Sequence, residues 1–234
     1  MGQTTQKGMG CPSFIFGRSI GKVLYGVGGL GCPAAENLVR AGVGTIGLID
    51  NDIVNLSNIH RQSLFDSKDV KKLKVSVAAK KLKEINPLTK IKTYKSKLVK
   101  KNIENIIKNY EIIIDGSDNF KTKFLINDYC IKYKKKLITG AISKFDGHIF
   151  VFDFKDKKTA SLKNFYQENE ISDDTLNCEF EGVLGTTASI VGTTQANEAL
   201  KMIMEIGQNL KNQILIIDLL NLSFRKVNFK KKKN

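Results

Sequence analysis

The feature that most constrains the fold is a strand, a glycine-rich turn, a helix and a second strand that follow one another over residues 22–50. Residues 22–26 (KVLYG) are apolar and β-prone, and they run into GVGGLG at 26–31. A helical stretch follows, and a second apolar strand at 45–49 ends in Asp50. Such crossovers are right-handed and place both strands parallel in one sheet. The chain therefore begins as a Rossmann-like fold.

The same alternation of helix and strand continues through the middle of the chain, and from Gly147 it gives way to strands joined by turns. We therefore predict an α/β fold whose largely parallel sheet carries helices on both faces and ends in an antiparallel extension. The further elements expected are a helix over 68–85, a strand at 91–94, a helix over about 99–109, a strand at 111–114, a helix over 118–134, strands at 136–139 and 149–152, a buried helix over 185–206, and strands at 214–218 and 222–227.

The chain has 234 residues, a length at which one core forms without disulfides or metals. We expect an irregular segment over 1–21, a single domain over 22–229 and a basic tail over 230–234. Within the domain, the polar stretch 155–181 is long enough to be a functional loop.

The net charge of +15 comes almost entirely from lysine, since Arg18, Arg40, Arg61 and Arg225 are the only arginines. The lysines are scattered and lack interleaved aromatic residues, so nucleic-acid binding is not expected and an acidic partner or compositional drift explains the charge equally well. The chain has no apolar run long enough to span a membrane and no secretory signal, which favours a cytoplasmic protein. Residues 1–35 contain no acidic residue, so an organelle transit peptide is the alternative to a cytoplasmic location.

The four cysteines, Cys11, Cys32, Cys130 and Cys178, form no C-x-x-C pair, and His60 and His148 are the only histidines. A structural zinc site is therefore not expected. Cys32 and Cys130 lie on apolar faces of predicted helices, whereas Cys178 lies near the end of the polar stretch.

The glycine turn is the first candidate binding site. In a G-x-G-x-x-G turn, the backbone at Gly26, Gly28 and Gly29 approaches phosphate at a helix N-terminus, and a carboxylate such as Asp50 takes ribose hydroxyls. This pattern alone fits any adenine nucleotide, NAD included. The glycines also fit a purely structural role in close packing of helix on strand.

A polar cluster follows Asp50 at the carboxyl end of the second strand, where open α/β sheets bind ligands. The guanidinium of Arg61 suits phosphate oxygens, and Lys74 adds a second positive charge. An ordinary surface ion pair is the alternative for each. The cluster comprises Asp52, Ser57, Asn58, Ile59, His60, Arg61 and Gln62.

A second polar turn, DGSDN at 115–119, follows the strand at 111–114. Its carboxylate and amide, Asp118 and Asn119, suit Mg²⁺ and a triphosphate. The alternative is that Asp118 serves as a helix N-cap.

These segments together resemble the ThiF/MoeB/HesA family, the ubiquitin-activating-enzyme-like adenylyltransferases. The resemblance spans about residues 22–228, and the order and spacing of its motifs agree as well as their residue types. The matching segments are GVGGLGCPAAENLVRAGVG at 26–44, LIDNDIVNLSNIHRQ at 48–62, LKVSVAAKKLKEINP at 73–87, DGSDNFKTKFLIND at 115–128 and CEFEGVLGTTASIVGTTQANEALK at 178–201.

The resemblance implies an ATP site formed by Gly29, Asp50, Ser57–Arg61 and Lys74, completed by Asn119 and by Asp118 near Mg²⁺. It implies adenylation of the C-terminal glycine carboxylate of a ubiquitin-like sulfur-carrier protein ending in Gly-Gly, for molybdopterin or thiamine synthesis, with release of pyrophosphate by a homodimer. Arg61, Lys74 and Asp118 would be the catalytic residues, and Cys178 would have a thiol role in some members.

Two departures from the family pattern are visible. Many relatives bind zinc through two C-x-x-C pairs, but the position of the first pair reads SLKN at 161–164 and no second pair follows. Relatives also tend to begin with an arginine-containing helix, which residues 1–20 do not match, and Arg18 is a poor substitute. These departures leave as an alternative a binding module that has kept the fold and lost catalysis. The glycine turn leaves a second alternative, an NAD-dependent oxidoreductase, for which no hydride-transfer centre is evident.

Overall fold

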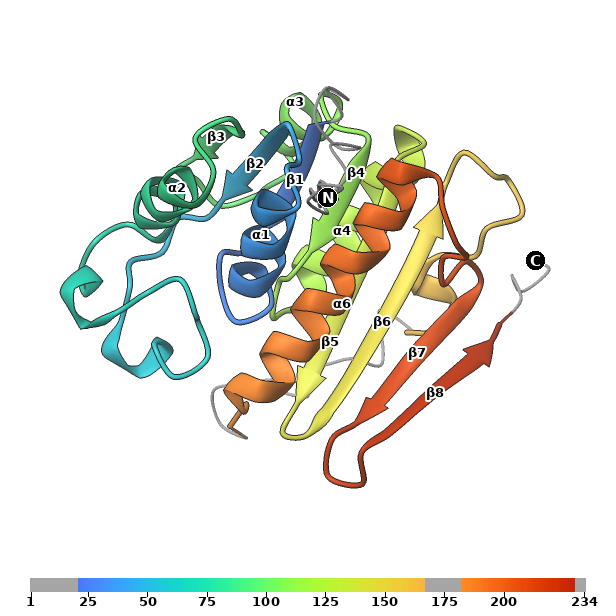
Figure 1. Cartoon of the computed structure of the whole chain (residues 1–234). Coiled ribbons are helices and arrows are strands. Elements are labelled where there is room, and N and C mark those ends of the chain that lie inside the picture. Colours follow the sequence, from blue (N-terminus) through green and yellow to red (C-terminus); the bar gives the residue numbers. More distant parts are fainter. Residues whose placement is uncertain (1–20, 167–181, 230–234) are drawn as a thin grey trace, which may run out of the picture.

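The computed structural model describes residues 21–166 and 182–229 (Figure 1). The segment 1–20, the tail 230–234 and residues 167–181 of the polar stretch lie outside the described residues. The strands are β1 (Gly21–Tyr25), β2 (Thr45–Ile49), β3 (Lys90–Tyr94), β4 (Ile112–Asp115), β5 (Lys136–Ser143), β6 (Asp146–Asp153), β7 (Gln213–Asp218) and β8 (Ser223–Asn228). The helices are α1 (Gly31–Arg40), α2 (Lys74–Ile85), α3 (Ile103–Ile107), α4 (Phe120–Lys132) and α6 (Gly185–Met204), with short 3₁₀ turns η1 (Leu56–Asn58), η2 (Ser67–Asp69) and η3 (Leu162–Asn164).

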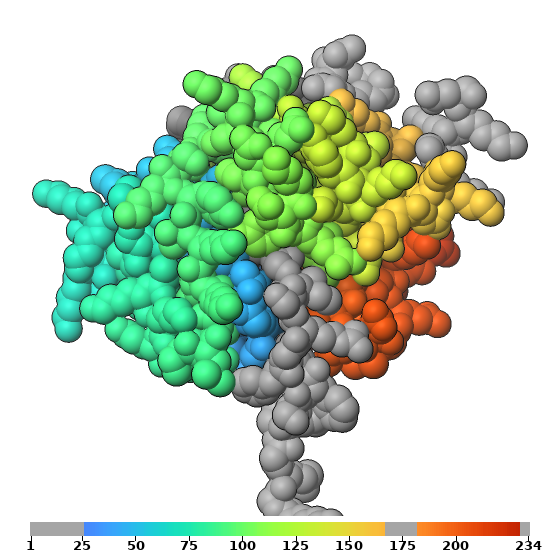
Figure 2. Space-filling view, turned by 90° about the horizontal axis from the view of Figure 1, so that it is seen from above, coloured from blue at the N-terminus to red at the C-terminus, as the bar shows by residue number. Residues whose placement is uncertain are grey.

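All eight strands form one sheet in the order β3-β2-β1-β4-β5-β6-β7-β8. Strands β3, β2, β1, β4 and β5 run parallel, and β6, β7 and β8 continue the sheet antiparallel. In Figure 2 the β3 side of the molecule, in teal and green, and the β8 side, in orange and red, lie on opposite flanks. The predicted α/β fold with an antiparallel extension is confirmed.

Helices cover both faces of the sheet, as expected. On one face α1, α2 and α6 enclose a core with the strands, built around side chains such as Leu38, Leu82 and Val191. On the other face α3 and α4 pack over a second core that includes Ile107, Phe124 and an aromatic group on β6. Strands β2 and β4 are buried along nearly their whole length, and both read as continuous apolar runs in the sequence, whereas the edge strand β3 is largely exposed and carries lysines.

Helix α6 runs across the sheet between α1 and β7 in Figure 1, and it can do so because glycines face it. A Cβ atom on Gly147 of β6 would clash with the Val191 side chain, and one on Gly140 of β5 would lie 3.0 Å from the Gln195 carboxamide. The helix therefore lies close to the sheet, and its middle and C-terminal turns carry the buried apolar side chains that the sequence predicted.

Several predicted boundaries are wrong, and local backbone chemistry explains the largest error. The helix predicted over 68–85 begins only at Lys74, because Asp66 and Asp69 form a capping box around η2 and Lys71 adopts a φ of 69°. The helix predicted over 99–109 is confined to α3, the one over 118–134 begins at Phe120, and β5 extends four residues beyond Thr139 to Ser143 to pair with β6.

Candidate nucleotide site

The sheet changes the direction of its strand order between β1 and β4, which is where open α/β sheets bind ligands. Tyr25 is in register with Ile49 and with Asp115, so the turns that follow β1, β2 and β4 meet at one edge. Gly26 adopts a φ of +73°, and a Cβ atom there would lie 3.2 Å from the carbonyl oxygen of Gly116. The glycine turn and the DGSDN turn therefore lie side by side.

Helix α1 begins directly after the glycine turn, and its N-terminus is uncapped. It has no side-chain cap and no acidic residue in its first turn. Gly28 and Gly29 precede it, and a Cβ atom at Gly29 would lie 3.2 Å from the Cβ of Ala188. An uncapped helix N-terminus carries unpaired N–H groups and a partial positive charge, which together suit a phosphate.

Asp50 holds the turn after β2 against the glycine turn. Its Oδ2 accepts a hydrogen bond of 2.9 Å from the backbone N–H of Val27, and its Oδ1 accepts one of 2.8 Å from Asp52. Burial raises the pKa of the Asp50 carboxyl, while these N–H donors and the nearby Lys74 ammonium oppose that effect. Each carboxylate oxygen retains a lone pair for a further donor, such as a ribose hydroxyl.

The polar cluster after β2 folds back over the glycine turn. Arg61 Nη1 lies 3.2 Å from the carbonyl oxygen of Ser57 and 2.8 Å from His60 Nε2. Lys74 Nζ lies 3.3 Å from Asp52 Oδ2, and the Lys74 side chain is 7% exposed while that of Asp52 is 61% exposed. Arg61 borders the glycine turn, since a Cβ atom on Gly29 would lie 3.7 Å from Arg61 Cγ. Lys74 lies near Asp50, and the Lys74–Asp52 pair faces solvent through its carboxylate.

Two carboxamides in this cluster are buried without a full set of partners. Asn58 is 7% exposed and Gln62 is 4% exposed, yet Asn58 Oδ1 and Gln62 Oε1 accept no hydrogen bond from the part of the chain that the structure describes. A Cβ atom at Gly28 would lie 3.8 Å from Gln62 Nε2, so this carboxamide borders the glycine turn. Buried acceptors without a donor cost free energy, and a bound polar ligand would relieve this cost. Ile59 is half-buried and packs against the larger core.

The N-terminal half of α6 completes the wall of the site. A Cβ atom at Gly185 would clash with the carbonyl oxygen of His60, and one at Gly192 would clash with that of Leu30. The helix therefore contacts both the polar cluster and the glycine turn. The sequence predicted α6 as a buried helix but gave no indication that its glycines lie against these two segments.

The DGSDN turn presents Asp118 outward. Asp118 is exposed, and Asn119 Nδ2 donates to its Oδ1 over 3.2 Å. Asn119 Oδ1 accepts the backbone N–H of Thr122 at 2.9 Å, so the N-cap of α4 is Asn119. The alternative reading of Asp118 as the helix cap is therefore wrong, and its carboxylate remains accessible to a ligand.

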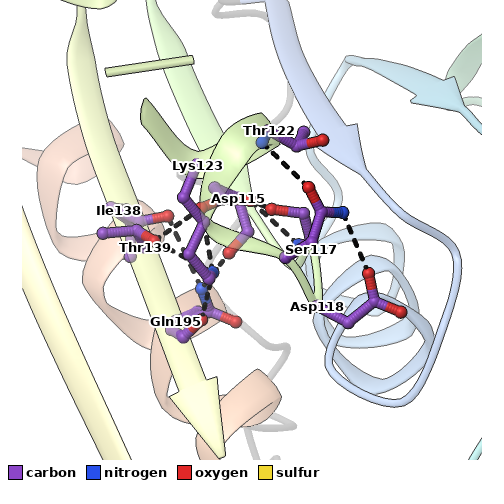
Figure 3. A network of polar contacts seen from close by, with 10 residues as sticks. Asp115, Ser117, Asp118, Thr122, Lys123, Ile138, Thr139 and Gln195 are labelled. Atoms are coloured by element: carbon purple, nitrogen blue, oxygen red, sulfur yellow. Dashed lines mark hydrogen bonds and ion pairs between the residues drawn. The ribbon is translucent and has the colours of Figure 1, made fainter. Parts of the chain in front are cut away.

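Beneath this turn lies a buried polar network that sequence reasoning missed, apart from Asp115 as the first residue of the turn (Figure 3). Lys123 Nζ lies 3.1 Å from Asp115 Oδ2, and Thr139 Oγ1 donates to the same oxygen over 2.6 Å. Gln195 Nε2 donates to the backbone carbonyl of Asp115 over 2.8 Å. The sequence offered one signal for this network, since Asp115 ends the otherwise apolar strand β4. A carboxylate buried at that position requires a cation buried next to it.

Two of the four cysteines lie within the described residues. Cys32 and Cys130 are buried free thiols on helices, as predicted, and burial raises the pKa of Cys32 to about 12. A thiol with this pKa is protonated at neutral pH and is a poor nucleophile. Cys11 and Cys178 lie outside the described residues.

No group of three or more His, Cys, Asp or Glu side chains over 21–166 and 182–229 is arranged to hold a metal ion. At 161–164 the chain forms a turn in which Ser161 N–H donates to Asn164 Oδ1 over 2.7 Å, with Leu162 buried. These side chains do not fit a structural zinc.

A sequence profile of the ThiF family matches residues 18–234, which is nearly the whole chain. The chain belongs to the ThiF family. The resemblance inferred from the motifs is thereby confirmed.

This ThiF-family chain is 40% identical over 214 residues to the probable molybdopterin-synthase adenylyltransferase of Gracilaria tenuistipitata var. liui, covering 91% of this chain and 59% of that protein. It is 37% identical over 208 residues to the sulfur carrier protein adenylyltransferase of Thermus thermophilus, covering 88% of this chain and 77% of that protein. The chain therefore spans about three fifths of the first relative and about three quarters of the second. The comparisons give the oxidoreductase alternative no support.

Among solved structures, the ThiF-family chain is similar to E. coli MccB crystallised with ATP. The TM-score is 0.79 at 20% sequence identity, over 91% of this chain and 64% of that one. At this identity the similarity shows a shared fold. The helices described over 21–166 and 182–229 include none that is both long and apolar enough to cross a membrane.

Proposed function

We propose that this chain is an ATP-dependent adenylyltransferase that activates the C-terminal glycine carboxylate of a ubiquitin-like sulfur-carrier protein. One observation carries the proposal. In a chain of this family, the glycine turn at the switch point of the sheet leads into an uncapped helix N-terminus and lies beside Arg61 and the turn that carries the exposed Asp118, and Lys74 lies near Asp50, which holds this turn.

The residues around the switch point fit ATP. The N-terminus of α1 would receive phosphate oxygens, and Asp50 would accept ribose hydroxyls. Asn58 and Gln62 would gain the partners that their buried carboxamides lack. Relatives are named as adenylyltransferases, and MccB, a protein of the same fold, has been crystallised with ATP.

The reaction asks little of acid–base chemistry. A carrier carboxylate oxygen would attack the α-phosphorus, forming a carboxyl–phosphate bond as the bond to pyrophosphate breaks. The carboxylate is already ionised at neutral pH, so no general base is required. Arg61 and Lys74 would align the triphosphate and offset the charge that moves onto the departing pyrophosphate.

Asp118, with Asn119 beside it, is the group best placed to hold Mg²⁺. Mg²⁺ is commonly bound by one or two carboxylates together with substrate phosphates, so a single accessible carboxylate is sufficient on the protein side. When bound, the ion would neutralise charge on the phosphates. The contribution of the chain is to keep the Asp118 carboxylate facing outward, which its hydrogen bond with Asn119 favours.

The carrier is identified by class. Relatives named for molybdopterin synthase and for a sulfur carrier support a small protein ending in Gly-Gly that serves molybdopterin or thiamine synthesis. We also propose that the chain acts as a cytoplasmic homodimer and that Cys178 takes part in sulfur transfer after adenylation rather than in adenylation itself. A single domain over 22–229, including the loop 155–181, remains a prediction.

ATP–pyrophosphate exchange tests the proposal. With Mg²⁺ and a ubiquitin-fold carrier ending in Gly-Gly, we expect exchange that depends on the carrier, and no exchange when the carrier lacks its last two residues. ATP binding without exchange, across several such carriers, would instead support the binding module that has lost catalysis. Absence of ATP binding would contradict the site assignment itself.

A further inference from the structure

The buried ion pair between Asp115 and Lys123 lies directly under the turn that carries Asp118. The Lys123 side chain is 4% exposed and that of Asp115 is 1% exposed, so neither reaches a ligand in the site. Desolvating two charges offsets much of their attraction, and apolar side chains of similar size commonly stabilise a core equally well. Stability alone is therefore a weak explanation for charges at this place.

The pair fixes both ends of the turn over residues 116–119. At the first end, Asp115 Oδ1 accepts hydrogen bonds from Ser117 N–H at 2.8 Å and from Ser117 Oγ at 2.6 Å. At the second end, Lys123 belongs to the first turn of α4, which Asn119 caps. The contact between Asp115 and Lys123 therefore spans the turn from below and limits the positions that Asp118 can take.

The same pair is anchored to two further elements. Lys123 Nζ donates to the carbonyl oxygen of Gly140 over 2.6 Å, and Thr139 Oγ1 donates to Asp115, which ties the turn to β5. Gln195 of α6 donates to the backbone of Asp115. Because the start of α6 lies against His60, both halves of the candidate site are positioned against one helix.

We propose that Lys123 is a positioning residue that sets the Asp118 carboxylate relative to Arg61 so that a single Mg²⁺–ATP contacts both. The inference rests on the proposed ATP site. Lys123 acts through Asp115 and the turn and touches neither ATP nor the ion. Its removal therefore affects the part of ATP affinity that depends on Mg²⁺, and leaves the contacts of the nucleotide with Asp50 and the glycine turn in place.

The test compares ATP affinity in Mg²⁺ with ATP affinity in EDTA by calorimetry, for the wild type, Lys123→Met, Lys123→Arg and Lys121→Met. Lys121 is the matched control because it is exposed on the same turn of α4. For Lys123→Met we expect the Mg²⁺-dependent gain in affinity to fall by about 10- to 100-fold, as for other residues that orient metal ligands, with affinity in EDTA unchanged. Lys123→Arg should restore part of the gain, because a guanidinium also donates to a carboxylate and a carbonyl. Lys121→Met should match the wild type.

Thr139→Val covers the case in which Lys123→Met does not fold. It removes one hydroxyl donor to Asp115, and we expect a smaller loss in the same Mg²⁺-dependent quantity. The inference is overturned if the folded variants retain the full Mg²⁺-dependent gain, or if affinity falls equally in Mg²⁺ and in EDTA. A wild type without any Mg²⁺-dependent ATP affinity would overturn the inference and the proposed function together. Mg²⁺-dependent binding without pyrophosphate exchange would contradict the proposed function alone.

Discussion

Two sets of charged residues meet at the carboxyl ends of the parallel strands, and they differ in their access to solvent. The exposed set consists of Asp52 and Asp118, which are exposed, together with the half-buried Arg61, and the charges of all three can reach a ligand. The buried network consists of Asp115 and Lys123 with their hydroxyl and carboxamide partners. The two charged groups contact each other and these partners, and neither can reach a ligand.

The difference separates the residues that we propose to contact ATP and Mg²⁺ from those that we propose to position them. An exposed charge contributes little to stability, because water screens it and its side chain loses entropy on pairing. A buried charge that loses its partner is costly, because it remains desolvated. We therefore expect substitutions in the exposed set to change activity alone, and substitutions in the buried network to change both activity and stability.

The largest effect should come from the exposed set. Arg61→Ala and Asp118→Ala should each lower carrier-dependent pyrophosphate exchange by about 10²- to 10³-fold, the range seen when a group that stabilises transition-state charge is removed. Their melting temperatures should match the wild type. Arg40→Ala is the matched control, because Arg40 pairs with Glu36 on the surface of α1, and it should retain full activity. Full activity in Asp118→Ala would contradict the site assignment.

Substitution of Lys81 on α2, which forms an ion-pair cluster with two carboxylates, should have an effect of intermediate size, on stability alone. Lys81 Nζ contacts the carboxylates of Asp66 and Asp69, and it anchors the loop between β2 and α2. The hydrogen bond from Lys81 lowers the pKa of Asp66. For Asp69, burial favours the neutral form, but the hydrogen bonds from Lys81 and from Asp66 N–H outweigh it and lower the pKa.

A carboxyl whose pKa is lowered by folding stabilises the protein above its unfolded pKa, and this contribution is lost as the pH falls through the folded pKa. Lys81→Met should therefore lower the melting temperature by about 2–4 °C at pH 7. The difference from the wild type should shrink as the pH falls below about 4. Lys80→Met, on the exposed face of α2, is the control. A difference that persists unchanged at low pH would show that the stabilisation is not electrostatic.

The smallest effect on adenylation should come from Cys178. Cys178→Ala should leave pyrophosphate exchange unchanged, since the charges proposed for adenylation do not include a thiol. Transfer of sulfur to the carrier should be lost if the thiol takes part in it, and a sulfur-transfer assay with the same variant measures this directly. Loss of exchange in Cys178→Ala would place the thiol in the first reaction.

Most of the fold could be predicted because three of the parallel strands, β1, β2 and β4, are largely apolar runs that end at a glycine or an acid. Strand β2 was predicted with its observed bounds, and the change to antiparallel pairing was placed close to Gly147. The start of α2 was missed because the capping contacts of Asp66 and Asp69 compete with the helical periodicity that follows. The start of β6 was missed because a buried glycine there leaves room for Val191, a contact that depends on a distant helix.

The candidate site divides in the same way. Asp50, Arg61, Lys74 and Asp118 could be proposed as site residues because they lie in polar segments that follow strands or begin helices, which is a local signal. Lys123, Thr139 and Gln195 could not, because they come from three elements and only the folded chain brings them to Asp115. Nothing in the sequence distinguishes Lys123 from the many other lysines, and its burial is visible only in the folded chain.

The most direct test of the account is to detect the carrier adenylate itself. The wild type, Arg61→Ala and Asp118→Ala would be incubated with Mg²⁺, ATP and a carrier ending in Gly-Gly, and the carrier would be analysed by intact-mass spectrometry with hydroxylamine trapping. The account predicts that the wild type forms an AMP adduct, or its hydroxamate, at the carrier C-terminus, and that each of the two variants forms either product about 10²- to 10³-fold more slowly. A wild type that binds ATP yet leaves the carrier unmodified, or an Asp118→Ala variant that forms the adduct at the wild-type rate, would contradict it.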